Sequence, residues 1–265
     1  MTEREIKPKP PVCLTIAGLD PSGGAGIIAD IKTFSTFGCF ATAAVASVTF
    51  QNTQGVFGAV HQTAETVRQQ VEPVAQDFEI AAVKTGMLPT REIIEEVARL
   101  IIELDVKNLV VDPVVRSTSG FDLIDDAALA AVIEKLFPLA TVITPNIPEA
   151  ERIAGMAIRT EDEIKKAAET MRSFGAANVL IKGGHLSAAK AQDFLFIGDS
   201  LHIFEAEFIE TTSTHGTGCT LAAAIAANIA LGKSLVDSVG IAKKFVNEAI
   251  RTAPGLGNGN SPINV

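Results

Sequence analysis

Hydrophobic and polar positions alternate along this chain in two distinct patterns. Short apolar runs, of the length that buried strands have, recur with polar segments between them. They occupy residues 12–17, 43–50, 80–85, 109–112, 140–144 and 179–182. After the first run, Ile27, Ile31 and Phe34 follow one another at helical spacing. Residues 12–34 therefore predict a strand, a glycine-rich loop at residues 23–26 and a helix.

Apolar side chains also recur every three or four residues in later segments, which is typical of amphipathic helices. The predicted helical faces are Ile93, Val97, Leu100, Ile101 and Leu104; Leu129, Val132, Ile133 and Leu136; and Ile164, Ala168 and Met171. Thr160 and Glu163 have the spacing of a capping box, which predicts that the third of these helices begins there. A short helix is predicted around Glu149, and two longer ones over residues 219–231 and 234–249.

Two late apolar runs predict a different element. Residues 194–197 and 202–208 are separated by Gly198 and Asp199, which is typical of an antiparallel hairpin. The preceding alternation of strands and helices implies a mainly parallel sheet covered on both faces. No linker, repeat or charge block divides the chain. We therefore expect one three-layer α/β/α domain over residues 1–265, with a late antiparallel hairpin and loose tails at residues 1–11 and 255–265.

Composition and charge exclude several classes of protein. Apolar residues make up 47% of the chain, enough for a large core, yet no apolar run approaches the ~20 residues that a membrane helix needs. Residues 1–11 lack an apolar signal core, so we predict no secretion. The net charge of −9 argues against nucleic acid or an anionic membrane as the main partner. Cys13, Cys39 and Cys219 are too scattered for a disulfide framework or a zinc site, which favours a reducing cytoplasm.

Candidate chemistry gathers where the predicted strands end. In a parallel sheet, ligands bind beyond the carboxyl ends of the strands. Unusual residues fall in these segments: residues 18–26, 51–54, 86–88, 112–120, 144–149, 182–185 and the loop before Cys219. The coincidence predicts an active site at this edge of the sheet.

The strongest single motif is THGTGCT at residues 214–220, which leads into a helix of small residues from Leu221. Backbone N–H groups at such a helix start bind a phosphoryl group and stabilise charge during its transfer. An ordinary glycine turn before a buried helix has the same sequence features, and the residues alone leave both interpretations open. The chain contains no G-x-x-x-x-G-K-[ST] motif, and residues 23–26 are no dinucleotide fingerprint, which disfavours P-loop and Rossmann mechanisms.

Several sequence blocks resemble one family in their order along the chain. Residues 14–26 (LTIAGLDPSGGAG) are similar to the opening of the phosphomethylpyrimidine kinases. Residues 51–53 (QNT), 84–88 (KTGML), 144–149 (TPNIPE), 182–185 (KGGH) and 215–220 (HGTGCT) match later blocks. The middle blocks are shared by the wider ribokinase-like superfamily, whereas the opening block, Gln51 and the GTGC form are specific to this branch. The resemblance implies a ribokinase-like fold.

The resemblance also implies catalytic roles at residues 216–219. Cys219 stands where sugar kinases of the superfamily have an aspartate that accepts the substrate hydroxyl proton. The N–H groups of Gly216, Thr217 and Gly218 would stabilise the moving phosphoryl group. A thiol at a helix N-terminus has a lowered pKa, so we expect Cys219 to be a competent base. Without the resemblance, a small buried structural cysteine would be the favoured interpretation.

Six residues are expected to bind the acceptor. Gln51 resembles the residue that reads the pyrimidine, because one amide can pair with a ring nitrogen and an exocyclic amine. The remaining five are implied as pocket residues by the same resemblance: Gly18, Asp20, Ala25, and the apolar walls Met87 and Val114. Met87 and Val114 alone would be assigned to the core.

The nucleotide and its metal ion are expected at a second group of residues. Asn146 and Glu149 resemble an element that positions Mg²⁺, usually through waters, although a plain helix start after Pro145 is the alternative. Asp112 would add a carboxylate behind the residues that hold the ion, and Lys182 and Thr214 would face the nucleotide phosphates. We expect a structural hydrogen bond from His215, and assign no role to His61, His185 or His202.

These expectations combine into one hypothesis. The chain would use MgATP, with a monovalent cation also allowed, to phosphorylate 4-amino-5-hydroxymethyl-2-methylpyrimidine to the monophosphate and then to the diphosphate in thiamine biosynthesis. Relatives are commonly homodimers, and we expect the same here. The alternatives are a pyridoxal or pyridoxine kinase of the same branch, which Gln51 disfavours, and a non-catalytic pyrimidine- or nucleotide-binding protein. A sugar kinase is disfavoured by Cys219.

Overall fold

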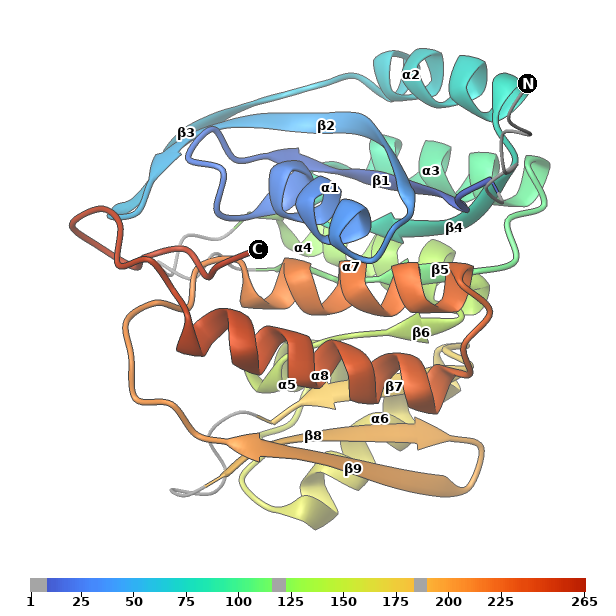
Figure 1. Ribbon diagram of the computed structural model, residues 1–265. Coiled ribbons are helices and arrows are strands. Elements are labelled where there is room, and N and C mark those ends of the chain that lie inside the picture. Colours follow the sequence, from blue (N-terminus) through green and yellow to red (C-terminus); the bar gives the residue numbers. More distant parts are fainter. Residues whose placement is uncertain (1–8, 116–122, 184–189) are drawn as a thin grey trace, which may run out of the picture.

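The computed structural model describes residues 9–115, 123–183 and 190–265, which form a single sheet with helices on both faces (Figure 1). The strands are β1 (Val12–Leu19), β2 (Phe40–Asn52), β3 (Gly55–His61), β4 (Ile80–Thr85), β5 (Leu109–Val111), β6 (Val142–Ile143), β7 (Asn178–Lys182), β8 (Lys190–Ile197) and β9 (Ser200–Glu207). The helices are α1 (Gly26–Thr36), α2 (Ala64–Asp77), α3 (Arg91–Glu103), α4 (Asp126–Ala131), α5 (Ile147–Ala154), α6 (Glu161–Ser173), α7 (Thr217–Ala230) and α8 (Leu235–Arg251).

The sheet confirms the predicted fold class. Its strand order is β3-β2-β1-β4-β5-β6-β7-β8-β9. The pairs from β2 through β1, β4, β5 and β6 to β7 are all parallel. The predicted late hairpin is β8–β9, which turns at Gly198 and Asp199 and pairs antiparallel with β7. Because the inner strands are parallel, their carboxyl ends lie along one edge.

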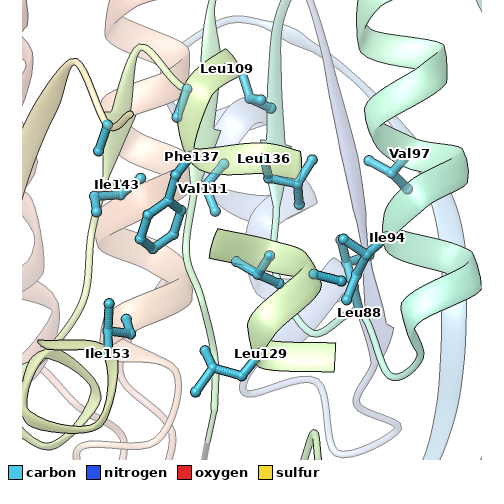
Figure 2. Close-up of a cluster of buried hydrophobic side chains, with 14 of the residues drawn as sticks. Leu88, Ile94, Val97, Leu109, Val111, Leu129, Leu136, Phe137, Ile143 and Ile153 are labelled. Carbon is cyan, nitrogen blue, oxygen red and sulfur yellow. The ribbon is translucent and has the colours of Figure 1, made fainter. Parts of the chain in front are cut away.

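Two hydrophobic clusters attach the helical layers to the sheet. Helices α1, α7 and α8 cover one face, and α2 to α6 cover the other (Figure 1). Figure 2 shows part of the larger cluster, in which Leu136 lies between Val111 of β5 and Val97 of α3. On the opposite face, α7 is buried without a break from Thr220 to Asn228, which explains its run of alanines. Among the described residues, no helix is long and apolar enough to cross a bilayer.

Two elements were missed by the sequence analysis. Strand β3 pairs antiparallel with β2 at the edge of the sheet, so the late hairpin is not the sole antiparallel part. Helix α2 buries only Val67 and Val71, an apolar stripe too narrow to give a clear helical pattern, and it contains Pro73. The predicted helix around Leu129 is also divided, because α4 continues into a π-helical turn (Val132–Leu136) and a 3₁₀ turn (Phe137–Leu139).

The predicted capping box at the start of α6 is confirmed. The Thr160 hydroxyl accepts the N–H of Glu163, and the Glu163 carboxylate accepts the N–H of Thr160. Asn146 and Glu149 form a second capping box at the start of α5. The predicted helix start after Pro145 is therefore present, whatever further role these two side chains have.

The expected loose tail at residues 255–265 is instead fixed to the molecule. The N–H of Asn260 donates to the carbonyl of Thr53 (2.7 Å), and the N–H of Ile263 donates to the carbonyl of His215 (3.3 Å). Ser261 and Ile263 are buried. These backbone hydrogen bonds tie the C-terminal segment to the β2–β3 turn and to the loop before α7, so the expectation was wrong. Residues 1–8 lie outside the described ranges.

Candidate active site

A cavity of about 620 Å³ lies beyond the carboxyl ends of the parallel strands. The structure brings together every residue that the sequence analysis assigned to a site. The residues are Gly18, Asp20, Ala25, Gln51, Met87, Asp112, Val114, Asn146, Glu149, Lys182, Thr214, Gly216, Thr217, Gly218 and Cys219, and all of them line this cavity. The structure thus places these residues together at the predicted edge of the sheet, while their assignment to an active site and their individual roles remain predictions. His185 and residues 116–120 lie outside the described ranges.

The loop before α7 has the geometry of an open anion site. Gly216 has φ 87°, and a Cβ there would lie 1.8 Å from the carbonyl oxygen of Gly24, so only glycine fits. The N–H groups of Thr217 and Thr220 donate to the carbonyls of Thr214 and Gly216. Those of Gly218 and Cys219 have no protein acceptor in the described part of the chain. Because these residues line the cavity, their amides are available to a ligand.

The thiol of Cys219 does not have the lowered pKa that its position at a helix start predicted. Burial raises the pKa of this thiol to about 11; Lys84 and the N–H of Gly26 oppose the shift, whereas Asp30 and Asp112 increase it. Desolvation of the thiolate therefore outweighs the favourable end of the helix. Cys219 is protonated in the free site at neutral pH.

Asp20 closes the first glycine-rich loop upon itself. Its Oδ1 accepts the N–H and hydroxyl of Ser22 (2.8 and 2.7 Å), and its Oδ2 accepts the N–H of Ala25 (2.9 Å). The ring of His215 also contacts Oδ2, through Nε2 at 2.7 Å, and Nε2 must be the donor because a carboxylate only accepts. Burial alone would raise the pKa of Asp20, but the hydrogen bonds from His215 and Ser22 hold it below its usual range. The structural hydrogen bond predicted for His215 is present.

Three of the predicted acceptor residues, Gln51, Met87 and Val114, lie at or just beyond the ends of β2, β4 and β5. Gln51 follows an irregularity in the β2–β3 pairing between Phe50 and Gln51, and such bulges re-aim side chains. Met87 follows β4 and is buried, while Val114 follows β5 and has φ 29°, a strained value for a β-branched residue. The next N–H, that of Val115, donates to Oε1 of Glu149 (3.2 Å), which helps to hold the strained segment in place.

The cavity lining also includes a lysine between two carboxylates, Lys182 with Asp112 and Glu149. Nζ of Lys182 is 3.0 Å from Oδ1 of Asp112, which also accepts the hydroxyl of Thr144 (3.2 Å). Burial alone would lower the pKa of Lys182, but the carboxylates of Asp112 and Glu149 more than offset this and raise it. A Cβ added to Gly218 would lie 3.3 Å from Nζ of Lys182, so this ammonium faces the open amides of α7. The arrangement suits a polyanion.

Asn146 and Glu149 use part of their hydrogen-bonding capacity in the α5 capping box. Oδ1 of Asn146 accepts the N–H of Glu149 (2.9 Å), and Oε2 of Glu149 accepts the N–H of Asn146 (2.8 Å). Burial raises the pKa of Glu149. Within the described ranges, no three His, Cys, Asp or Glu side chains form a metal-binding group. The oxygen-only donors therefore fit a hydrated Mg²⁺ bound through waters better than a directly caged ion.

Sequence reasoning missed several residues of the cavity. Lys84 and Asp30 form a buried ion pair, and Lys243 and Asp193 form another at 2.8 Å. An apolar stretch of the wall was also missed, formed by Phe208, Ile209, Val246 and Ile250. A signal existed for the first pair, because a lysine inside an apolar strand is rarely buried without a partner. Nothing local in the sequence indicated which aspartate would pair with it.

Comparison with known proteins places this geometry in context. The family model for phosphomethylpyrimidine kinase matches residues 20–264. The hydroxymethylpyrimidine/phosphomethylpyrimidine kinase of Bacillus subtilis (strain 168) is 46% identical over 252 residues, which are 95% of this chain and 93% of that protein. A crystal structure of phosphomethylpyrimidine kinase from Clostridium difficile 630 has a TM-score of 0.80 at 40% identity, covering 91% of this chain and 99% of that chain. The pyridoxal kinase of B. subtilis, solved as an ADP complex, has a TM-score of 0.88 at 36% identity, covering 97% of both. These similarities confirm the resemblance that the motifs indicated.

Proposed function

This chain belongs to the phosphomethylpyrimidine kinase family and is an ATP-dependent kinase, and we propose that its acceptor is 4-amino-5-hydroxymethyl-2-methylpyrimidine and then the resulting monophosphate. One observation carries the proposal. The free amides of Gly218 and Cys219 face a cavity that also holds a thiol and the Lys182 ammonium. The B. subtilis relative bears the name of both activities.

In the first phosphorylation, the hydroxyl oxygen of the acceptor attacks the γ-phosphorus of ATP and the bond to the β,γ-bridging oxygen breaks, releasing ADP. The hydroxyl proton passes to Sγ of Cys219. The amides of Gly218 and Cys219 and the Lys182 ammonium stabilise the negative charge on the moving group. Because burial raises the pKa of Cys219 to about 11, the thiolate is a minor form at neutral pH. The first phosphorylation should therefore accelerate as the pH rises toward that value.

The acceptor ring would bind beside Gln51. Its amide carbonyl and NH₂ are complementary to the exocyclic amine and a ring nitrogen of an aminopyrimidine. Met87 and Val114 would cover the ring with apolar surface. The triphosphate would lie along Lys182 and Thr214, and the base against the apolar stretch that includes Phe208 and Val246.

Magnesium is part of the proposal. Asn146 and Glu149 would hold the hydrated ion, and the Asp112 carboxylate would contact it indirectly, through water. The ion supplies positive charge that neutralises the nucleotide phosphates. Glu149 is expected to do this as a carboxylate, since the positive charge of the ion favours the ionised form.

A homodimer is also part of the proposal. The edge formed by β2 and β3 exposes apolar side chains, with Phe50 52% and Phe57 68% exposed. Large exposed apolar residues on an edge hairpin are typical of a surface that another chain covers. Light scattering of the purified protein, compared with Phe57→Glu, tests this: a dimer is expected, and a variant that becomes monomeric would assign the interface.

The second candidate is a pyridoxal kinase, favoured by the similarity to the B. subtilis pyridoxal kinase over 97% of both chains. Pyridoxal also carries a hydroxymethyl group on an aromatic nitrogen ring. Gln51 distinguishes the two. Gln51→Ala is expected to weaken phosphorylation of the aminopyrimidine far more than that of pyridoxal. A larger loss with pyridoxal would favour the second candidate.

The decisive experiment is a phosphoryl-transfer assay with the aminopyrimidine, its monophosphate and pyridoxal. Cys219→Ala is expected to reduce the first phosphorylation by about 10²- to 10⁴-fold. The second should change much less, because its nucleophile is already a phosphate oxygen. Cys39→Ala, which removes a buried thiol outside the cavity, is the matched control. Equal losses in both steps would remove Cys219 as the base, and absence of turnover with all three acceptors would leave a binding protein.

A further inference from the structure

Lys84 is a charged residue at the centre of the sheet with no assigned role. It lies in β4 opposite Thr15 of β1 and is 0% exposed to bulk solvent, yet it contributes to the cavity wall. Its Nζ donates to Oδ2 of Asp30 on α1 at 2.8 Å, and the same oxygen accepts the hydroxyl of Thr15 at 2.6 Å. An ion pair so deep is costly to desolvate and adds little net stability by itself.

Both partners of this ion pair keep hydrogen-bonding groups that the pair does not use. An ammonium has three hydrogens, and in the described part of the chain Asp30 is the acceptor for one of them. Oδ1 of Asp30 is buried and has no partner among the described residues. Burial alone would lower the pKa of Lys84, but the Asp30 carboxylate more than offsets this and holds it above its usual range. Lys84 is therefore a fixed positive charge that faces the cavity.

The group that this charge acts on is the Cys219 thiol. Helix α7, whose first turn contains Cys219, packs directly on β4 and on α1, and Lys84 and Cys219 line the same cavity. The charged groups that influence Cys219 are Lys84 from β4, Asp30 from α1, Asp112 after β5 and Lys182 from β7. Lys84 is the strongest of these influences and the main one that favours a thiolate.

We propose that Lys84, held in place by Asp30 and Thr15, is a positioning residue that supplies the countercharge for the Cys219 thiolate. The inference rests on the proposed function, since it explains how a buried thiol serves as a base. When the thiolate takes the hydroxyl proton, the new O–P bond forms and the bond to ADP breaks. Lys84 keeps its own proton throughout. The resulting neutral thiol is the resting form at neutral pH, and it loses its proton to solvent again before the next transfer.

The test removes the charge without leaving an unpaired ion. The double variant Lys84→Met with Asp30→Asn replaces both charged groups with neutral ones of similar size. The single variant Lys84→Met is made in parallel, and the double variant decides the outcome if the single one does not fold. The matched control is Lys243→Met with Asp193→Asn, which neutralises a partly buried lysine–aspartate pair elsewhere in the cavity wall.

The readout is the titration of Cys219 itself, which needs no substrate. Iodoacetamide alkylation of Cys219 is followed by peptide mass spectrometry from neutral to strongly alkaline pH. In the single variant Lys84→Met the thiol pKa should rise by about one unit, which slows alkylation about tenfold at a fixed pH below it. In the double variant the rise should be smaller, because Asp30, whose charge raises this pKa, is neutralised as well. The control pair should leave the titration unchanged. A Cys219 pKa that rises in neither folded variant would overturn the proposal.

Kinetics provide the second readout. The double variant should lose about 10- to 100-fold in kcat with the aminopyrimidine and change less than about threefold with the monophosphate, because only the first acceptor needs a base. Equal losses with both acceptors would instead place Lys84 on the phosphoryl group and also overturn the proposal. If the wild type phosphorylates neither acceptor, the proposed function fails, whereas the alkylation result still decides whether Lys84 tunes the thiol.

Discussion

Two glycine-rich loops meet at the cavity, and they differ in one respect that decides what each can do. The loop before α1 begins with Asp20, whose carboxylate accepts the N–H groups of Ser22 and Ala25. Residues 214–219, at the end of the loop before α7 and in its first turn, include no carboxylate. In the described part of the chain, the amides of Gly218 and Cys219 are left without a protein acceptor.

The difference shows that glycines determine the path of such a loop but not whether its N–H groups are free to bind a ligand. Both loops turn tightly into a helix, and both line the same cavity. In the first loop an internal anion already occupies the converging N–H groups. In the second, that place is open to the phosphoryl group of a ligand. A closed loop is therefore expected to contribute stability, and an open one to contribute catalysis.

Filling the open loop should have the largest effect. Gly218→Ala places a methyl group 3.3 Å from Nζ of Lys182, where the phosphoryl group would pass, without strain in the helix. We expect kcat to fall by about 10²- to 10³-fold with either acceptor. The melting temperature should hold or rise slightly, because alanine is the better helix former. Gly240→Ala, inside α8 and outside the cavity, is the control that should keep full activity. Normal activity of Gly218→Ala would mean that phosphate passes elsewhere.

Removing the internal anion of the closed loop should have the next largest effect. The folded state holds the pKa of Asp20 below its usual range, so the stabilisation is present above the ordinary aspartate pKa and is lost as the pH falls through the folded value. Asp20→Asn should reduce the free energy of unfolding by about 3 kcal/mol at neutral pH. The difference in unfolding free energy between wild type and variant should become smaller below about pH 4. Urea denaturation across this pH range measures this difference. If it stays constant with pH, the hydrogen bonds to the charged carboxylate are not its cause.

Crowding the closed loop should have a smaller effect on stability. A Cβ on Gly24 would lie 2.4 Å from Cδ2 of His215 and 2.9 Å from Cβ of Pro262. Gly24→Ala is expected to cost about 2 kcal/mol, because it forces the His215 ring away from Asp20. Thermal unfolding gives the loss, and kcat should recover when the assay is run well below the melting temperature. A variant that is stable yet inactive would reverse the roles of the two loops.

Loosening the C-terminal segment should have the smallest effect. The Ser261 hydroxyl accepts the N–H of Leu256 at 2.8 Å, and the Ser261 carbonyl accepts the N–H of His215. Ser261→Ala removes the first contact and the hydrogen bond from the hydroxyl to the Pro262 carbonyl (3.3 Å), keeps the backbone contact to His215, and should cost about 1 kcal/mol of stability. Hydrogen exchange at His215 and Thr53 would show whether the segment supports both loops. Unchanged exchange at both would limit its role to its own turn.

Much of the fold was predictable because its signals are local. The strand before Gly18 and the capping box of Thr160 and Glu163 depend on near neighbours, and both were predicted. Strand β3 and helix α2 were not, since β3 is a half-exposed edge strand and α2 has only a narrow apolar stripe with Pro73 inside it. In both cases contact with neighbouring elements compensates for a weak local pattern.

For the candidate site, the sequence indicated which residues would lie together but not their electrostatics. The motif residues are found together because they end neighbouring parallel strands. The pKa of Cys219 was predicted in the wrong direction, because a helix start is visible in the sequence whereas burial among α1, β4 and α7 is not. The pairing of Lys84 with Asp30 joins residues 54 positions apart, and only the folded sheet brings them together.

The apolar wall of the cavity has a practical consequence for spectroscopy. The chain contains neither tryptophan nor tyrosine, so the protein absorbs and fluoresces only weakly in the near ultraviolet. Phe208 lies in the wall beside the proposed nucleotide position. A Phe208→Trp variant would carry a sole indole emitter at the cavity, and its fluorescence would report occupancy without an attached dye.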